Sequence, residues 1–431
     1  MNNKKTLFSN FLSLSLNQKF LRLGIVIYAI SAVTSITGMA FGLVLGLIGS
    51  IIYIISKSKL ITKERNITVI SLLIVIFAII TFISTILSVN PLSSFYRYRS
   101  FLGELAMFFI ILYASENDPE NNFRKKVIEI IIIFAIIESI YGIVQYLTGI
   151  DPLRIEKSTP FSPIQRIRGT LGHWNALGGM LGMVYPLCLA VIYYYFRIKN
   201  KTFYFYIFGI SVISICLILT FTRGAWLGVI CGLIIMGISK NKKLLIFPLI
   251  FILLIFLVPQ SRNRIINSIK KPDIERMFVW ESTIDMIKKK PIFGWGQDTF
   301  QNEFYTHYTT NLKARKILDE FGKRVFDVRG IHFHTHNVYI GLIQETGIFG
   351  LIVFLTILFT IFKRIILILK NNFNFWEKTL TWGILGVIVD FSVHGLLDYP
   401  LRAETAYMFW FLAGLLFSFD KKNVINKGNS H

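Results

Sequence analysis

The sequence predicts an all-α integral membrane protein, and three observations lead to that prediction. Of the 431 residues, 54% are hydrophobic and only 16% are charged, with a mean hydropathy of +0.58, whereas a soluble domain needs a more polar surface. The apolar runs are long enough to cross a hydrocarbon core as helices, which takes roughly 20 residues. They do not alternate with polar residues, so helices are favoured over a β-barrel.

The apolar runs predict about twelve transmembrane helices in two groups, separated by one long polar segment. Residues 1–258 are expected to hold helices one to nine, residues 259–336 a large extracytoplasmic loop containing short helices, and residues 337–431 the last three helices and a cytoplasmic tail. The first two helices are separated only by a turn near Thr37 and Gly38. The expected spans are near residues 24–38, 40–56, 67–88, 100–114, 127–148, 174–195, 203–221, 223–238, 244–258, 337–362, 379–397 and 403–418.

The distribution of Lys and Arg predicts the side of the membrane on which each connecting segment lies. When the N-terminus is placed inside, most basic residues of the short connecting segments fall on the same inner side. Cytoplasmic loops carry such an excess, whereas long loops cross largely regardless of charge. Both termini are therefore expected in the cytoplasm. The net charge of +22 does not indicate nucleic-acid binding, because the basic residues are scattered at the ends of apolar runs.

The long segment 259–336 has the pattern of a folded cap rather than of a flexible linker. Its spacing predicts a helix from Arg276 to Lys290, ended by Pro291 and followed by a turn at 294–296. A second helix is expected over residues 311–321. The apolar face of the first helix is expected to consist of Met277, Trp280, Ile284 and Ile287.

Four basic residues are placed by this topology at one level of the molecule: Arg168, Arg223, Arg276 and His336. Each alone has a simple explanation, because interfacial arginines extend their charge toward water and loop histidines are usually solvated. Arg223 is the sharpest case, because an arginine near hydrocarbon is costly unless it faces a polar cavity. Guanidinium groups match phosphate oxygens in bidentate geometry, so several arginines around one cavity would suit a pyrophosphate.

Other polar residues of the apolar regions have simpler interpretations. Asp390 and His394 are four residues apart and are expected to pair on one helix face, and Glu138 and Glu345 are further intramembrane polar groups. His332, His334 and His336 alternate just before a helix, which is a possible metal pattern, but no further ligand is obvious, so we expect no metal. Cys188, Cys216 and Cys231 lie in apolar runs and are expected to be packing residues. A P-loop, a G-x-S-x-G motif and a Rossmann glycine pattern are absent from the sequence.

The order of several short motifs resembles that of bacterial O-antigen ligases and the related O-antigen polymerases. The clearest is His336-Asn337 followed after nine residues by Gly347-x-x-Gly350. The resemblance extends from about residue 130 to about residue 400. The other matching segments are Arg168-Gly169 with Asn175, Thr222-Arg223-Gly224-Ala225, Arg276-x-x-x-Trp280, Pro291-x-x-Gly294-x-Gly296 and His394-x-x-x-Asp398. The histidines at 332 and 334 and the segment His173-Trp174-Asn175 depart from the usual pattern.

The resemblance implies a metal-independent, inverting glycosyltransferase of the bacterial cytoplasmic (inner) membrane, without cofactors, whose active site is extracytoplasmic. The implied donor is an undecaprenyl-pyrophosphate-linked glycan and the acceptor is a lipid or another glycan. The implied catalytic residues are His336, Arg223 and Arg276, and the implied substrate-binding residues are Arg168, Asn175 and Asn337. Ligase and polymerase activities are not distinguished by these residues. A flippase of lipid-linked glycan is the alternative from another class, although such proteins tend to place charge near the membrane midplane.

Overall fold

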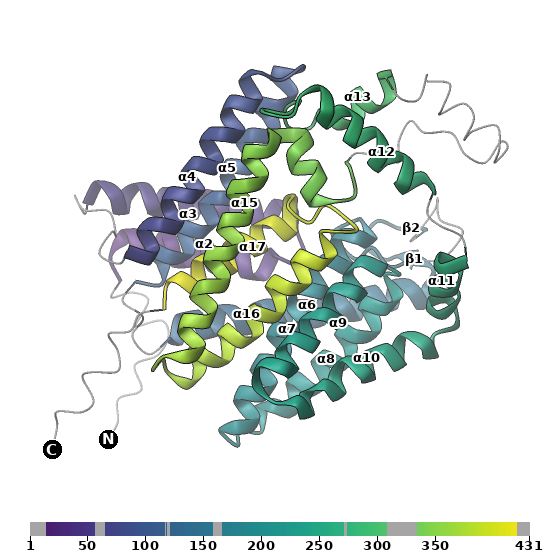
Figure 1. Cartoon of the computed structure of the whole chain (residues 1–431). Coiled ribbons are helices and arrows are strands. Elements are labelled where there is room, and N and C mark those ends of the chain that lie inside the picture. The colour runs from purple at the N-terminus through teal and green to yellow at the C-terminus, as the bar shows by residue number, and fades with distance from the viewer. Residues whose placement is uncertain are drawn as a thin grey trace.

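The chain folds into a bundle of α-helices with one very short β-hairpin (Figure 1). The computed structural model describes residues 14–56, 65–116, 118, 121–157, 166–270, 274–307 and 334–419. The all-α prediction is confirmed at the level of fold class. The helices are α2 (Leu16–Ser31), α3 (Ile36–Ser56), α4 (Arg65–Ile86), α5 (Pro91–Ala114), α6 (Asn122–Thr148), α7 (Trp174–Arg197), α8 (Thr202–Leu219), α9 (Arg223–Lys240), η1 (Lys242–Leu245), α10 (Ile246–Leu257), α11 (Pro259–Lys270), α12 (Ile274–Lys289), α13 (Phe300–His307), α15 (Val338–Lys370), α16 (Phe375–His394) and α17 (Ala403–Phe417).

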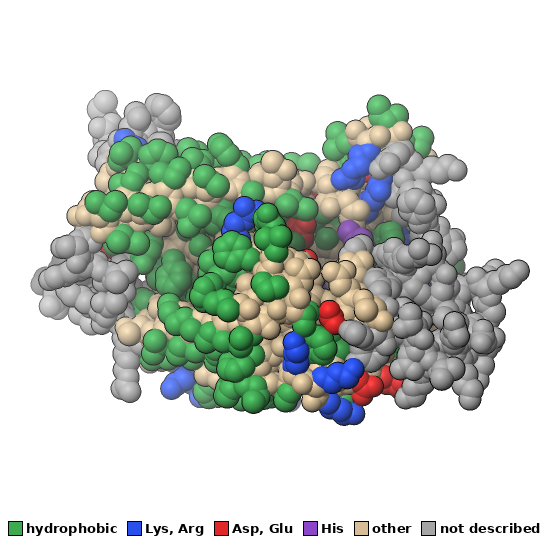
Figure 2. Space-filling model, turned by 90° about the horizontal axis from the view of Figure 1, so that it is seen from above, with side chains coloured by type: hydrophobic (Ala, Val, Ile, Leu, Met, Phe, Trp, Pro, Cys, Tyr) green, Lys and Arg blue, Asp and Glu red, His purple; other side chains and the backbone are tan. Residues whose placement is uncertain are grey.

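Each expected span overlaps a helix of the described chain, but the count of twelve spans stays a prediction. Among the described residues, seven helices are long and apolar enough to cross a membrane, and an eighth is formed if residues 242–257 and 259–270, which meet at 95°, count as one broken span. Large apolar side chains remain exposed along several of these helices. Figure 2 shows such side chains over much of one face of the molecule. This surface is that of a multi-pass membrane protein, for which lipid is the solvent.

Two expected boundaries were wrong at the N-terminal side. The turn between α2 and α3 covers residues 32–35 and not Thr37 and Gly38. Helix α2 begins earlier than expected, at Leu16, and Gln18 in its first turn donates to the Tyr113 carbonyl at 3.0 Å. Helix α5 begins at Pro91, before the expected residue 100, and its Arg97 pairs with Glu104 at 2.7 Å. Apolar runs locate the lipid-facing part of a helix, whereas these polar ends are stabilised by contacts with neighbouring helices.

The most buried helices are α7, α16 and α17, which form the centre of the bundle. Helix α16 packs against both α7 and α9, α17 packs against α5, and α15 packs against α4. Two small strands, β1 (Ile150–Asp151) and β2 (Glu156–Lys157), pair antiparallel between α6 and α7. The ends of α7, α9 and α16 therefore come together, and the candidate site lies among them.

The segment 259–336, which we call the cap segment, forms a small hydrophobic core of its own. Helix α12 confirms the expected helix within one or two residues, whereas α11 and α13 were not predicted, and the helix expected at 311–321 lies outside the described residues. The expected apolar face of α12 was wrong in part: Trp280 packs against this core, but Met277 and Ile284 are about half exposed. The buried residues of this core are Val279, Met286, Trp295, Phe300 and Phe304.

The cap segment is attached to the bundle at a kink in α15. Gly347 has φ 71°, and a side chain there would collide with the Ile292 carbonyl oxygen at 1.8 Å from the Cβ position. Around the kink, the Trp295 N–H donates to the Gln344 carbonyl at 2.8 Å, and the Ile348 N–H donates to the Pro291 carbonyl at 2.9 Å. The motifs Pro291-x-x-Gly294-x-Gly296 and Gly347-x-x-Gly350 are thus the two sides of one contact.

Candidate functional site

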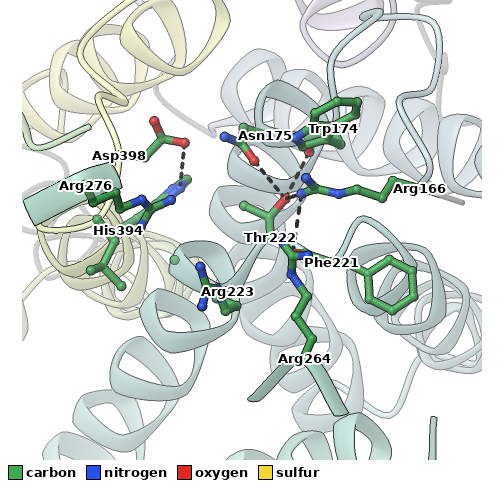
Figure 3. Close-up of a pocket in the computed structure, with 12 residues that line it drawn as sticks. Arg166, Trp174, Asn175, Phe221, Thr222, Arg223, Arg264, Arg276, His394 and Asp398 are labelled. Carbon is green, nitrogen blue, oxygen red and sulfur yellow. Dashed lines mark hydrogen bonds and ion pairs between the residues drawn. The ribbon is translucent and has the colours of Figure 1, made fainter. Parts of the chain in front are cut away.

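A small, strongly cationic pocket opens where the ends of α7, α9, α12 and α16 meet the connecting turns between helices (Figure 3). Four arginines and one aspartate line it, and its volume is about 70 Å³. A space of that size holds a few atoms of an anionic group and not a whole sugar. The lining residues are Arg166, Trp174, Asn175, Phe221, Thr222, Arg223, Gly224, Arg264, Arg276, His394, Leu397 and Asp398.

Arg223 is the first residue of α9 and is placed by the tight turn that precedes it. The turn is held by Thr222, whose hydroxyl lies 3.3 Å from the Asn175 side-chain oxygen and 3.2 Å from the Trp174 carbonyl. The buried Phe221 has φ 54°, an uncommon conformation for a residue with a side chain. On the other side, the Arg223 guanidinium contacts the Ser268 hydroxyl of α11. Contacts from two directions thus hold this cation at the pocket.

Gly224 allows α9 to approach α16 closely at the same level. A Cβ at this position would lie 2.7 Å from the His394 ring. His394 is the last residue of α16, and its Nε2 lies 3.8 Å from the Asp398 carboxylate. The Thr-Arg-Gly motif therefore combines a held turn, a cation and a position without a side chain. Each residue type of the motif has its own physical reason.

Arg166, and not the predicted Arg168, belongs to the pocket. The Arg166 guanidinium lies 4.3 Å from the Trp174 ring centroid and donates to the carbonyls of Thr220 (2.9 Å) and Phe221 (3.3 Å). Arg168 instead lies 3.3 Å from the buried Asp151 carboxylate, beside the β1–β2 hairpin. Arg168 thus does not line this pocket, and its predicted role in substrate binding stays a prediction. Residues two apart in a regular extended strand share a face, so the motif alone did not predict that these two side chains separate.

Arg264 and Arg276 come from the cap segment. The sharp bend before α11 brings Arg264 to the pocket, one turn before Ser268, which contacts Arg223. Arg276 lies in the first turn of α12. Four residues later on that helix, the Trp280 indole N–H donates to the Thr335 carbonyl at 3.0 Å. The spacing Arg276-x-x-x-Trp280 thus places one residue at the pocket and ties the same helix to the segment before α15.

His336 lies next to the pocket and is linked to it through Asp398. The His336 Nδ1 is 3.3 Å from Asp398 Oδ1, and the two residues are 62 positions apart in the chain. Asn337, predicted to bind substrate, uses its side-chain oxygen to accept from the Tyr339 and Ile340 N–H groups and its amide nitrogen to donate to the Leu396 carbonyl. These contacts cap α15 and hold it against the turn that carries Asp398. The predicted role of Asn337 in substrate binding stays a prediction.

Of the acidic residues in the apolar regions, Glu138 and Glu345 have hydrogen-bond partners among the described residues, whereas Asp390 has none. The expected pair of Asp390 and His394 was wrong, because His394 faces Asp398, and Asp390 has no hydrogen-bond partner in the described part of the chain. Glu138 accepts from the Thr170 backbone (2.6 Å) and hydroxyl (2.8 Å). Glu345 accepts from the Tyr399 hydroxyl at 2.7 Å. None of these contacts points to a proton relay.

The electrostatics of the pocket favour an anionic ligand. Burial and the nearby Arg264, Arg223 and Arg276 lower the pKa of the Arg166 guanidinium, although Asp398 opposes this. Asp398 carries the only carboxylate among the lining residues, and its contacts with His336 and His394 outweigh burial and hold its pKa well below the usual range. Four cations that face one anionic side chain repel one another, and an anion with several oxygens relieves that repulsion.

The structure brings most of the sequence-predicted residues together and adds others. Arg223, Arg276 and Asn175 line the pocket, and His336 adjoins it. Sequence reasoning missed Arg264 altogether, since it lies in an unpredicted helix. Asp398 stood in a quoted motif but received no role, and Arg166 lies two residues before the quoted Arg168-Gly169. Only the fold distinguishes the two from their neighbours. The catalytic and binding roles of all these residues stay predictions.

Comparison with known proteins agrees with this architecture. The O-antigen ligase family model matches residues 208–355, a range that contains Arg223, Arg264, Arg276 and His336. A Rickettsia conorii protein that carries the provisional name polysaccharide ligase is 23% identical over 219 residues. That match covers 47% of this chain and 47% of the relative, so the chain matches about half of the relative's length.

The fold and the pocket define a multi-pass α-helical membrane protein with a cationic site at the ends of its helices. Over residues 208–355 the chain is similar to the O-antigen ligase family, which agrees with the resemblance in the order of its sequence motifs. The matched range begins within α8 and ends within α15, and it includes the turn before Arg223 and the whole cap segment.

Proposed function

We propose that the chain is a membrane glycosyltransferase of polysaccharide biosynthesis, which moves a glycan from undecaprenyl pyrophosphate to an acceptor hydroxyl on the extracytoplasmic face. The observation that carries the proposal is the placement of four arginines around one small pocket, directly beside the His336–Asp398 pair. Similarity to the O-antigen ligase family over residues 208–355 supports the reaction class. The acceptor is a lipid core or a second glycan, and the residues of the pocket do not select between ligase and polymerase.

The arginines are suited to the leaving group. In the reaction, an acceptor oxygen forms a bond with the anomeric carbon while the bond from that carbon to the pyrophosphate oxygen breaks, which inverts the carbon. The electron pair and the developing charge stay on the pyrophosphate. Arg166, Arg223, Arg264 and Arg276 surround the place where that charge would lie. Preorganised cations of this kind often make the largest contribution to catalysis, and this scheme needs no metal or nucleotide.

His336 and Asp398 are suited to take the acceptor proton. When the His336 Nδ1–H donates to Asp398 Oδ1 at 3.3 Å, the neutral ring keeps its proton on Nδ1 and presents Nε2 as a base. The acceptor O–H proton then moves to Nε2, and the carboxylate stabilises the resulting imidazolium. This is the role that a buried aspartate has in Ser-His-Asp hydrolases, reached here in an unrelated fold.

The predicted topology supports the extracytoplasmic face. Arg166, the turn before Arg223, the cap segment and the turn with Asp398 are four separate parts of the chain, and each lies in a segment that the charge distribution assigns to the outside. Undecaprenyl pyrophosphate is a membrane lipid, so its glycan would reach the pocket at the membrane surface. Membrane lipids and the acceptor are the other expected partners, and nucleic acid is not.

The proposal is tested with purified protein, synthetic undecaprenyl-pyrophosphate oligosaccharide and separate lipid-core and glycan acceptors, with products measured by mass spectrometry. Arg223→Ala is expected to lower transfer by roughly 10²–10³-fold, as for the loss of one group that stabilises transition-state charge. Arg262→Ala is the matched control, because Arg262 is exposed on α11, two residues before Arg264, and does not line the pocket.

Both variants must be inserted and folded to the same extent for the comparison to count. Full transfer by Arg223→Ala would exclude the proposed role of the pocket. If intact donor crosses liposomes and no acceptor is glycosylated, the chain is a flippase and the proposal is wrong.

A further inference from the structure

Three potential metal ligands converge beside the pocket although they are far apart in the sequence. His334, His336 and Asp398 each offer one ligand atom, and these atoms all lie within 4.8 Å of one another. Asp398 Oδ1 is 3.8 Å from His334 Nε2 and 3.3 Å from His336 Nδ1. His394 faces the other oxygen of the same carboxylate, so it does not occupy the shared space. The sequence showed the histidines but not the third ligand, which follows 62 residues later.

The spacing of these atoms fits a tetrahedral transition-metal ion. Zinc binds histidine nitrogen and carboxylate oxygen at about 2.0–2.2 Å, which places neighbouring ligands roughly 3.3–3.5 Å apart. His336 Nδ1 and Asp398 Oδ1, at 3.3 Å, already have this separation. His334 Nε2, at 3.8 Å from the same oxygen, needs only a small rotation of side chains. Two histidines and one carboxylate leave a fourth position for water, as in zinc sites with three protein ligands.

The three side chains are also accessible. Their exposed fractions are 26% for His334, 15% for His336 and 11% for Asp398, so an ion can enter from solvent. Neutral imidazole and ionised carboxylate are the forms that bind metal.

We propose that His334, His336 and Asp398 form an inhibitory binding site for Zn²⁺ or a similar divalent transition metal. The ion binds His336 Nδ1, so the single N–H proton of the neutral ring must lie on Nε2 instead of Nδ1. That atom then no longer accepts a proton, and Asp398 is no longer available to stabilise an imidazolium. Binding stands on geometry alone, whereas inhibition rests on the proposed role of His336 as the base.

Metal binding has one local cost. His334 Nδ1 accepts from the His336 N–H at 3.3 Å, and this contact is lost when His334 binds a metal through Nε2, because the proton must then be on Nδ1. A long hydrogen bond between neutral groups contributes little to the free energy of folding, so the bonds to the ion outweigh its loss. The same contact suggests the variant for the test. Asn at position 334 keeps an oxygen acceptor near the position of Nδ1 and removes Nε2.

The test measures Zn²⁺ binding to the purified full chain by competition with a chromophoric chelator, and glycan transfer with and without Zn²⁺. The wild type is expected to bind one ion and to lose at least 90% of transfer when saturated. His334→Asn should bind at least tenfold more weakly and keep transfer at that zinc concentration. His173→Asn is the matched control, since His173 Nδ1 also accepts from the N–H two residues later, at 3.2 Å, and is not in the cluster. It should bind as tightly as the wild type.

The readouts separate this proposal from the proposed function. Failure of the wild type to bind Zn²⁺, or equal binding by His334→Asn, would overturn the metal site whatever the transfer assay shows. Tight binding that requires His334, with transfer unchanged by zinc, would overturn the inhibitory role. If the chain transfers no glycan at all, the binding data still decide the site, and only the proposed function falls.

Discussion

At the scale of single residues, the pocket depends on which of two neighbouring arginines points inward. Arg166 stacks on Trp174 and holds the turn before Arg223, whereas Arg168 pairs with Asp151. The two belong to the same short basic motif, but only one of them contributes charge to the pocket. The same contrast applies to Asp390 and Asp398, of which only the second contacts His336.

Replacing these two arginines by lysine should separate their roles. Arg166→Lys keeps a charge but loses the planar group that stacks on Trp174 and donates to two carbonyls, so transfer should fall by roughly 10²-fold. Arg168→Lys keeps an ion pair with Asp151, and transfer should stay within about threefold of the wild type. Initial rates with a fixed donor and acceptor measure both. Equal losses would contradict the assignment of Arg166 in preference to Arg168.

Asp398→Asn should impair the proton acceptor without removing the histidine. An amide cannot hold the same tautomer of His336 or stabilise its imidazolium, so kcat should fall by roughly 10²–10⁴-fold while KM for the donor changes little. Thermal unfolding of the variant shows whether the bundle is intact. A folded variant with normal kcat would mean that His336 does not act as the base, or that it acts without Asp398.

At the scale of elements, the cap segment is held to the bundle by a kink and not by apolar packing alone. The N–H groups of Trp295 and Gly296 donate to the carbonyls of Gln344 and Glu345, which lie just before the kink at Gly347. Because α12 and α11 supply Arg276 and Arg264, this contact sets the position of half of the arginines in the pocket. The two glycines of Gly347-x-x-Gly350 therefore have different functions.

Gly347→Ala should release the cap segment, and Gly350→Ala should be milder. The first places a side chain at φ 71° and against the Ile292 carbonyl, a backbone atom that cannot move alone. The second has no positive φ, and its nearest contacts are atoms of the Thr346 side chain, of which the hydroxyl can rotate away while the Cβ, at 2.7 Å, needs a small backbone shift. We expect Gly347→Ala to cost about 1–3 kcal/mol and to lower the apparent Tm and transfer together. A Tm for Gly347→Ala at or above that of Gly350→Ala would refute the kink as the attachment point.

At the scale of the whole molecule, the pocket collects segments that are distant in sequence at one level of the helix bundle. Residues from before α7, from the α8–α9 turn, from the cap segment and from the α16–α17 turn all line it. Helices that cross a membrane alternately bring such turns to the same side, as the charge distribution predicts. The connection between α7 and α8, at the opposite end of these helices, should then face the cytoplasm.

Cysteine labelling in intact cells tests this orientation. In a variant without Cys188, Cys216 and Cys231, the exposed Lys270 of α11 and the exposed Lys201 before α8 are each replaced by cysteine. A maleimide that does not cross membranes should label Lys270→Cys directly and Lys201→Cys only after permeabilisation. The reverse pattern would place the pocket in the cytoplasm and exclude the proposed use of an extracytoplasmic donor.

The sequence by itself determined the fold class, the approximate position of the helices and the resemblance to O-antigen ligases. Those features follow from runs of apolar residues and from short motifs, which are local properties of the chain. Only the tertiary structure decided three other features: the inward turn of Arg166, the approach of Asp398 to two histidines, and the docking of the cap segment at Gly347. Each depends on the relative rotation and tilt of helices far apart in sequence, and the side-chain contacts that set those angles have no local signature.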